Sequence, residues 1–438
     1  MARDPAPAGR PATMARVAAR LTTPFAYVGV LGGLQVLLLW RLELLVGPWI
    51  AGLATALWLA LLMLLVLAPG RWRLKLAVAT LLAIACAIVP TLVGIITRAR
   101  VGVTIEHDGL LQIESAIDRL LAGQPIYGVD WSNTPMARLP WDLTPGGNPA
   151  IHHLAYYPLT ILVGVPFRLL TDALGLPFDY RLVLIAFGLI GLGAILTLPI
   201  AAERRLMVIA AIYLSPMITL YLWPGRTDIE FLSMLLVSLA LLTRGHLTWA
   251  AVALGVAVAF KPLAWPAVPF FLLLLYLRWR AERRTREVLI GGAAVALFPL
   301  VTVAPFFLAN PSGFWTDIVL FTAGGIKDVY PINGYGFAEL LYRMGLIARR
   351  TDSFPFGIMQ LAAMVPVLWF GARTVLRQPT LGRWMGAYAA LLFVFTFVGR
   401  FFNDNYVGVV VAMFLLAPAL GNRLLVAPPR QQAEQVAA

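Results

Sequence analysis

Charged side chains are few in this chain, and several of them stand in short clusters between long apolar runs. Glu106, His107 and Asp108 form one such cluster, while Arg226 and Lys261 stand in two others. A carboxylate such as Asp108 can accept the proton of a hydroxyl group and act as a general base. Arginine and lysine side chains bind phosphate oxygens. The chain therefore contains residues that could activate a hydroxyl and hold a phosphate, provided that the fold brings them together.

The composition excludes a soluble enzyme. Of the 438 residues, 13% are charged and 60% are hydrophobic, whereas a soluble domain is about 25% charged and about 45–50% apolar. Long, nearly uncharged runs repeat from end to end, which predicts an all-α polytopic membrane protein and not a barrel of alternating strands. The net charge of +13 then indicates membrane topology and attraction to anionic lipids, with no nucleic-acid partner.

Twelve apolar runs are predicted to span the membrane, although several are shorter than the roughly 20 residues that a straight span needs. They are 24–45, 47–69, 74–97, 180–202, 205–222, 228–243, 247–260, 263–279, 286–309, 358–376, 381–400 and 405–424. Residues 1–23 and 425–438 are predicted to be cytoplasmic tails that flank one membrane-embedded domain, 24–424. The one cysteine, Cys86, lies in an apolar run and is expected to be buried, which excludes an internal disulfide framework and a cysteine metal site.

The apolar segment 156–170 decides the orientation of every later helix. It is only about 15 residues long and contains Pro158 and Pro166. If it crossed the membrane, the arginine-rich loop 278–286 would lie outside, against the tendency of Lys and Arg to stay in the cytoplasm. We therefore predict that 156–170 lies along the outer interface, that both termini are cytoplasmic, and that the long segments 98–179 and 310–357 face outward.

The two outer segments combine short amphipathic helices with turns. The first is predicted to contain a helix over 109–122, preceded by Asp108, that lies flat on the membrane surface. The second contains a turn-rich stretch, 330–336, and then a short helix at about 337–347. The predicted topology places further polar residues on the same side of the membrane; they are His152, His153, Asp228, Tyr330, Asn333, Tyr335 and Asn403.

Two blocks of the sequence carry a family resemblance. The first is Gly225-Arg226-Thr227-Asp228, a helix, Thr243-Arg244-Gly245-His246, a second helix and Phe260-Lys261-Pro262. The second is an acid, Asp108, at the start of an outer amphipathic helix, followed by Leu-Leu-Ala-Gly-Gln-Pro-Ile-Tyr at 120–127 and Tyr-Pro-Leu at 157–159. Together they resemble the bacterial family 87 glycosyltransferases, also called the DUF2029 family, whose first block reads Gly-Gln-x-Asp/Asn, helix, Arg-Gly, helix, Lys-Pro. Arg226 departs from the usual Gln, and one proline follows Tyr157 where two are common.

The resemblance implies a GT-C architecture, which is a helical membrane bundle with its active site at the outer face. It also implies an inverting transfer of a sugar, with mannose favoured, from a polyprenyl-phosphate donor to a lipid or glycan acceptor. Because nucleotide sugars are cytoplasmic, an outward-facing site needs such a lipid-carried donor. The phosphate leaves without a general acid, so one carboxylate base and one or two cations suffice. No cofactor is expected, since the lipid-linked sugar is a substrate.

The resemblance assigns the general base to Asp108, whose alternative role is to cap the helix that follows. Glu106 is the second candidate for the base. His107 either orients the carboxylate or is simply exposed. Lys261 and Arg226 are assigned to the donor phosphate.

Each of these assignments has a structural alternative. Lys261 could extend toward the membrane interface without a ligand, and Arg226 could pair with Asp228 or Glu230. Asp228 could in turn be structural or hold a sugar hydroxyl.

The other polar residues have more open roles. His152 and His153 could bond to phosphate or sugar, or lie at the interface; adjacent histidines point apart and no third ligand has regular spacing, so no metal site is expected. A further group could bind an acceptor sugar, or could dock a turn and cap a helix; its members are Trp315, Tyr330, Asn333, Tyr335, Asn403 and Asp404.

Two other functions fit a polytopic membrane protein. A transporter or flippase of lipid-linked material would place polar groups near the membrane midplane and often shows inverted repeats. This sequence shows no clear repeat, and its charges stand at helix ends. A non-catalytic assembly factor would not need acidic and basic residues that converge.

Overall fold

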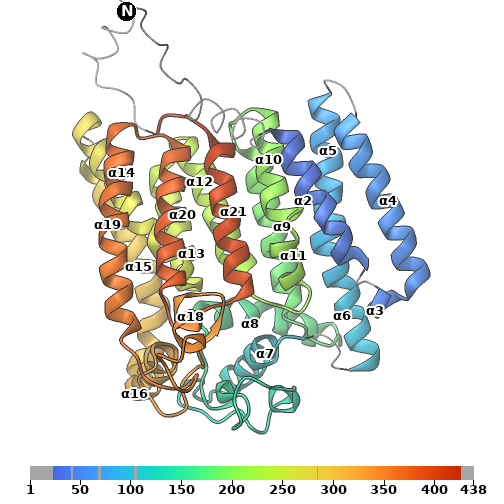
Figure 1. Ribbon diagram of the computed structural model, residues 1–438, viewed down its shortest axis with the longest axis vertical. Helices are drawn as coiled ribbons and strands as arrows, with labels where there is room; N and C mark the ends of the chain where they lie inside the picture. The colour runs from blue at the N-terminus through green and yellow to red at the C-terminus, as the bar shows by residue number, and fades with distance from the viewer. Residues whose placement is uncertain (1–22, 41–42, 68–70, 103–105, 284, 426–438) are drawn as a thin grey trace, which may run out of the picture.

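The computed structural model describes residues 23–40, 43–67, 71–102, 106–283 and 285–425. The predicted N-terminal tail, up to residue 22, and the C-terminal tail from residue 426 lie outside the described residues. Figure 1 shows a bundle of upright helices with α7, α8, α16 and α18 gathered at one end. This end is called the loop end below.

Upright helices make up most of the described chain, and each of the twelve predicted ranges coincides with one of them or with a consecutive pair. They are α2 (Pro24–Leu39), α4 (Pro48–Leu67), α5 (Trp72–Ala83) continued by α6 (Val89–Val101), α9 (Arg181–Thr197), α10 (Ala202–Tyr213) with α11 (Pro216–Leu222), α12 (Asp228–Thr243), α13 (Leu247–Phe260), α14 (Val268–Glu282), α15 (Thr285–Ala309), α19 (Phe356–Arg377), α20 (Leu381–Phe397) and α21 (Asp404–Leu420). A single short turn, α3 (Glu43–Val46), joins α2 to α4.

Five helical stretches among the described residues are long and apolar enough to cross a membrane. They are Pro48–Leu67, Trp72–Val101, Pro262–Glu282, Thr285–Ala309 and Phe356–Arg377. The pair α10 and α11, bent by 49°, would make a sixth. The predicted class, a polytopic helical membrane protein, agrees with these stretches, while the count of twelve spans stays a prediction because the other upright helices are shorter.

The outer surface of the bundle is strongly apolar. Trp49 is 89% exposed, Leu308 74% and Ile358 73%, and a water-soluble monomer rarely leaves such apolar surface uncovered. At the centre, α12 packs between α9 and α13 and buries most of its side chains. The bundle therefore has a packed interior and a surface suited to lipid.

The longest helical stretch, Trp72–Val101, contains one irregular turn. A π-helical turn occupies Ile84–Ile88, and Cys86 within it is buried, as predicted. Pro90 has no amide hydrogen, so it cannot bond to the Cys86 carbonyl four residues earlier. The indole N–H of Trp223 donates to that carbonyl at 3.1 Å instead. The irregular turn thereby connects this stretch to the loop between α11 and α12.

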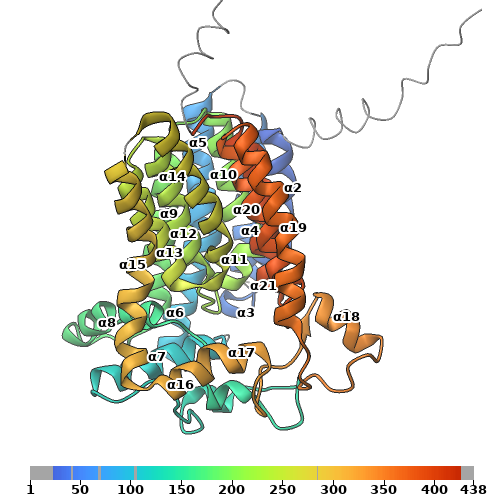
Figure 2. The same ribbon diagram turned by 90° about the vertical axis from the view of Figure 1, so that its left-hand side faces the viewer.

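The two predicted outer segments meet at the loop end (Figures 1 and 2). The first contains α7 (Asp108–Leu121) and α8 (Pro158–Ala173), and the second contains α16 (Pro311–Trp315), α17 (Phe321–Ala323) and α18 (Phe337–Arg343). The strand β1 (Asn333–Gly334) pairs in parallel with β2 (Phe401–Phe402), with Asn333 opposite Phe401. This pairing attaches the second segment to the connection between α20 and α21.

Helix α7 begins at Asp108 and is amphipathic, but the prediction that its apolar face rests on the membrane is wrong. Leu110, Ile113 and Ile117 are fully covered by protein, and α7 packs against α8. On another face Gln112 is buried too, and its amide donates to the carbonyls of Ala150 and His153. The apolar face therefore packs on other parts of the same chain.

Helix α8 covers most of the segment 156–170, and it lies across the loop end beside α7. Figure 2 shows it roughly perpendicular to the upright helices. This orientation agrees with the prediction that the segment does not cross the membrane. It also leaves α9 as the helix that connects the loop end to the opposite end.

Cysteine labelling can test this arrangement. In a Cys86→Ala background, cysteines at the exposed positions Gly146 and Ala201 should lie on opposite sides of the membrane, because only α9 crosses between them. We expect a membrane-impermeant maleimide to label Gly146→Cys in intact cells and to label Ala201→Cys only after the cells are lysed. Labelling of both positions from the same side would mean that α8 also crosses.

Candidate active site at the loop end

Three groups hold the carboxylate of Asp108 at the start of α7. The amide of Asn148 donates to Oδ2 at 2.8 Å, and the backbone N–H of Gly109 donates to Oδ1 at 2.7 Å. Nδ1 of His107 lies 2.8 Å from Oδ1. His107 is the N-cap residue of α7, but Asp108 also accepts a backbone N–H of the first turn, so its structural role at the helix start holds beside the predicted catalytic one. The Asp108 side chain remains 22% exposed and is open to one further partner.

The environment of Asp108 favours its ionised form. Burial alone raises the pKa of Asp108, but the charge and hydrogen bond of His107 and the donors from Asn148 and Gly109 together lower it well below its usual value. At neutral pH the group is therefore a carboxylate in a fixed orientation. Such a group can accept a proton from a bound hydroxyl.

The charges of Asp108 and Arg226 both act on the pKa values of two tyrosines. Burial raises the pKa of Tyr156 and of Tyr330, the Asp108 charge raises it further, and the Arg226 charge opposes the shift. The Tyr156 hydroxyl also packs against Gly109 so closely that a Cβ at that position would collide with it. The acidic and basic parts of the predicted site are neighbours along the backbone, because the N–H of His107, next to Asp108, donates to the carbonyl of Pro224 at 2.8 Å.

Lys261 and Arg226 belong to one hydrogen-bonded network. Nζ of Lys261 lies 2.6 Å from Oδ1 of Asp228, whose Oδ2 accepts from the amide of Asn405 at 2.7 Å. One terminal nitrogen of Arg226 donates to Oδ1 of Asn405 and to Oδ1 of Asp404, each at 2.7 Å. The structure therefore brings both predicted phosphate ligands together at the loop-end termini of α12, α13 and α21.

The pairing of charges in this network differs from the alternatives considered from the sequence. Arg226 pairs with Asp404, while Asp228 pairs with Lys261. Glu230 is fully buried and accepts from the hydroxyl of Tyr180. Within the described part of the chain, Nε of Arg226 is buried without a hydrogen-bond partner. A phosphate would have to compete with two carboxylates for these cations.

Tyr330 and Asn403 join this region, and Tyr335 lies beside it, with its backbone N–H donating to the carbonyl of Phe402 at 2.9 Å. Asn403 is the N-cap residue of α21 but makes no capping bond with its side chain; its amide donates to the Tyr330 hydroxyl at 3.5 Å. Its Oδ1 is buried with no partner among the described residues. A side-chain hydrogen bond with Asn333 also acts to lower the pKa of Tyr330. The side chain of Tyr335 is 70% exposed. The capping alternative therefore does not account for the side chain of Asn403.

The two adjacent histidines lie in a different pocket. Nδ1 of His153 is 2.8 Å from Oδ1 of Asp317, and His152 faces Asp130 at 3.5 Å. Both histidines line a pocket of about 390 Å³ with Asn310 and other polar residues of 310–317. Arg226 is not among the residues that line it, so the histidines do not share the cation network. Across the part of the chain that the structure describes, no group of three or more His, Cys, Asp or Glu side chains is placed to hold a metal ion.

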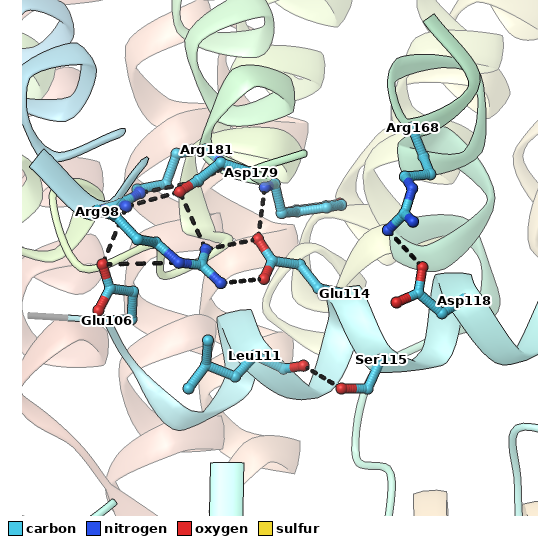
Figure 3. Close-up of polar contacts among 10 residues, drawn as sticks. Arg98, Glu106, Leu111, Glu114, Ser115, Asp118, Arg168, Asp179 and Arg181 are labelled. Carbon is cyan, nitrogen blue, oxygen red and sulfur yellow. Dashed lines mark hydrogen bonds and ion pairs between the residues drawn. The ribbon is translucent and has the colours of Figure 1, made fainter. Parts of the chain in front are cut away.

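Glu106, the second candidate for the base, belongs to a separate buried cluster. Its side chain has no exposed surface, and its Oε1 lies 3.2 Å from Arg181. Figure 3 shows this cluster, which also contains Arg98, Glu114 and Asp179. A carboxylate held there cannot meet a substrate hydroxyl, so the geometry favours Asp108.

Among the loop-end residues that no sequence pattern singled out are Asn148, Asp317 and Arg181. Asn148 stands in a predicted turn, but nothing in the turn pattern indicates that its side chain reaches Asp108. Asp317 lies in the second outer segment with no motif around it. Arg181 stands at the start of a predicted span, and its partners come from three separate segments.

A double substitution can test the coupling between Lys261 and Asp228. Lys261→Met should destabilise the protein by on the order of 3 kcal/mol, because it leaves the largely buried Asp228 carboxylate without its cation. Adding Asp228→Asn removes that charge and should recover most of the loss in thermal-melting measurements in detergent. If the double variant melts as low as Lys261→Met alone, the two side chains do not form a stabilising pair.

Comparison with known proteins gives one similar solved structure. No family model matches the chain, and no curated protein matches it. The crystal structure of ArnT from Cupriavidus metallidurans bound to undecaprenyl phosphate is similar to this chain, with 18% sequence identity and a TM-score of 0.46. The similarity covers 84% of this chain and 63% of the ArnT chain, so the chain spans less than two thirds of ArnT. The resemblance to family 87 glycosyltransferases thus depends on the sequence motifs.

Proposed function

We propose that this protein is an inverting membrane glycosyltransferase of the GT-C type. It transfers a sugar, with mannose favoured, from a polyprenyl-phosphate donor to a lipid or glycan acceptor at the outer membrane face. The observation that carries the proposal is that an ionised carboxylate, Asp108, and the network of Arg226 and Lys261 lie at the same end of the bundle. Lys261 stands in the Lys-Pro motif that resembles family 87, whereas Arg226 stands where that family usually has Gln.

The chemistry needs each of these groups. Asp108 accepts the proton of the acceptor hydroxyl as its oxygen attacks the anomeric carbon of the donor sugar. The bond between that carbon and the phosphate oxygen breaks, and the lipid phosphate leaves with the electron pair. Arg226 and Lys261 stabilise the charge that develops on the phosphate. Attack from the face opposite the leaving phosphate inverts the configuration at the anomeric carbon.

A lipid-linked donor suits the position of the site. The polar network lies at the loop-end termini of α12, α13 and α21, and helices of this bundle expose apolar surface. A polyprenyl chain could therefore remain among membrane lipids while its phosphate reaches the loop end. The undecaprenyl phosphate bound to ArnT is a lipid of the same chemical class as the proposed donor.

The proposed activity can be tested directly. Purified protein in nanodiscs, incubated with polyprenyl phosphates that carry mannose, arabinose, glucose or galactose, should hydrolyse or transfer one of these sugars. Asp108→Asn should lower the rate by roughly 10²–10⁴-fold, because it removes the base and keeps a side chain of the same shape. Glu106→Gln, which removes a carboxylate of the buried cluster, is the comparison variant and should retain more activity than Asp108→Asn. A folded wild-type protein that uses none of these donors would refute the proposal.

The two cations should act mainly on the donor. Arg226→Met keeps much of the apolar stem and removes the charge, so we expect a higher KM for the donor and a nearly unchanged KM for the acceptor. Arg349→Met removes an exposed arginine of the second outer segment and serves as the control. If Arg226→Met leaves donor kinetics unchanged, as the control should, the phosphate binds elsewhere, and the pocket with His152 and His153 becomes the next candidate.

A further inference from the structure

The guanidinium of Arg181 is completely buried, and all of its nitrogens have partners. Nε and one terminal nitrogen donate to the two carboxylate oxygens of Asp179 at 2.9 and 2.7 Å. The second of these nitrogens also donates to Glu106 at 3.2 Å, and the other terminal nitrogen donates to the backbone carbonyl of Trp223 at 3.1 Å. Figure 3 shows this arrangement around the start of α9, except for the contact with Trp223.

These contacts join two chain segments that lead into the candidate site. Glu106 stands two residues before Asp108, and Trp223 stands three residues before Arg226. The segments also touch directly, since the backbone N–H of His107 donates to the carbonyl of Pro224 at 2.8 Å. Arg181 therefore lies where the segment that carries the proposed base meets the segment that carries a proposed phosphate ligand.

The surroundings of Arg181 fix its position. Arg98 holds Glu114 through two hydrogen bonds at 2.9 and 2.7 Å and donates to Asp179 at 3.0 Å, so Asp179 is shared between two arginines. A Cβ at Gly94 would come within 2.8 Å of the Arg181 guanidinium, which means that the glycine leaves room for it. The guanidinium can thus hold three partners in one plane, a geometry that a lysine ammonium cannot reproduce.

We infer that Arg181 is a positioning residue, which sets the spacing between Asp108 and Arg226 without touching the substrate. The inference rests on the proposed transferase function. Arg181 acts through Glu106 on one segment and through the Trp223 carbonyl on the other. Displacing a catalytic group by about 1 Å can cost on the order of 10²-fold in rate, so a small loosening of these segments should be visible in turnover.

The test compares Arg181→Lys with Arg168→Lys. Both substitutions keep the positive charge and remove the planar fork. Arg168 also pairs with carboxylates, those of Asp118 and Asp172, but it contacts neither segment of the site. Hydrogen–deuterium exchange in nanodiscs should increase in peptides covering 106–112 and 223–228 of Arg181→Lys, and should match the wild type there in Arg168→Lys.

Kinetics separate positioning from stability. For Arg181→Lys we expect kcat to fall by about 10–100-fold with little change in the donor KM, whereas a purely structural role would lower the melting temperature and leave the turnover of each folded molecule unchanged. In an Asp108→Asn background the same substitution should cost much less, because both changes affect one group. If Arg181→Lys does not fold, Glu106→Ala removes the acceptor of one of the two links and should loosen 106–112 alone.

Two results would overturn the inference. One is unchanged exchange in both segments of Arg181→Lys, and the other is increased exchange with wild-type kcat. Inactivity of the wild-type protein with every donor would refute the proposed function instead, while the exchange measurement would still show whether Arg181 holds the two segments together. The two failures are therefore distinguishable.

Discussion

An ionised side chain that is removed from water costs several kcal/mol unless an opposite charge and hydrogen bonds compensate it. This constraint governs the loop end, where charged residues lie at the margin of an apolar bundle. The paired residues come from different elements: Arg98 of α6 holds Glu114 of α7, and Lys261, directly after α13, holds Asp228 of α12. The need to neutralise these charges therefore fixes which helix ends meet, and the candidate site is formed where they meet.

The same constraint affects how a phosphate would bind in the proposed reaction. Arg226 and Lys261 already neutralise Asp404 and Asp228. A donor phosphate that binds these cations therefore weakens existing ion pairs, and its binding free energy is the difference between the attraction it forms and the attraction that is lost. A lipid-phosphate sugar carries one negative charge, and the departing phosphate acquires a second as the bond to the sugar breaks. The cations would then interact more strongly with the leaving group than with the intact donor, which is the preference that accelerates a reaction.

Features that depend on hydropathy and helical periodicity could be predicted from the sequence. The helical membrane class, the gathering of the two long segments at one end and the start of α7 at Asp108 all follow from such patterns. The partner of the apolar face of α7 could not be predicted, since amphipathicity shows that a face is covered but not what covers it. For this reason the predicted contact with lipid was wrong.

The pairing of charged side chains within the site could not be predicted from the sequence either. Glu106 and Asp108 are two residues apart and look equally suited to act as a base, yet only the first faces Arg181. The pairing of Arg226 with Asp404 joins residues that are distant in sequence, and no local pattern distinguishes Asp404 from Asp228 as its partner. Such choices depend on the relative rotation of helices, which packing determines.

The irregular turn at Ile84–Ile88 has a consequence for how related sequences should vary. Pro90 leaves the Cys86 carbonyl free, and Trp223 occupies it. An ordinary residue at position 90 would offer its own amide to that carbonyl, which would then no longer depend on the indole. With proline at position 90, loss of the indole would remove a donor from a buried carbonyl. Trp223 thus offsets the donor that Pro90 lacks, so a proline at position 90 should be accompanied by a side-chain donor at position 223 among homologues, even though the two positions are far apart in the chain.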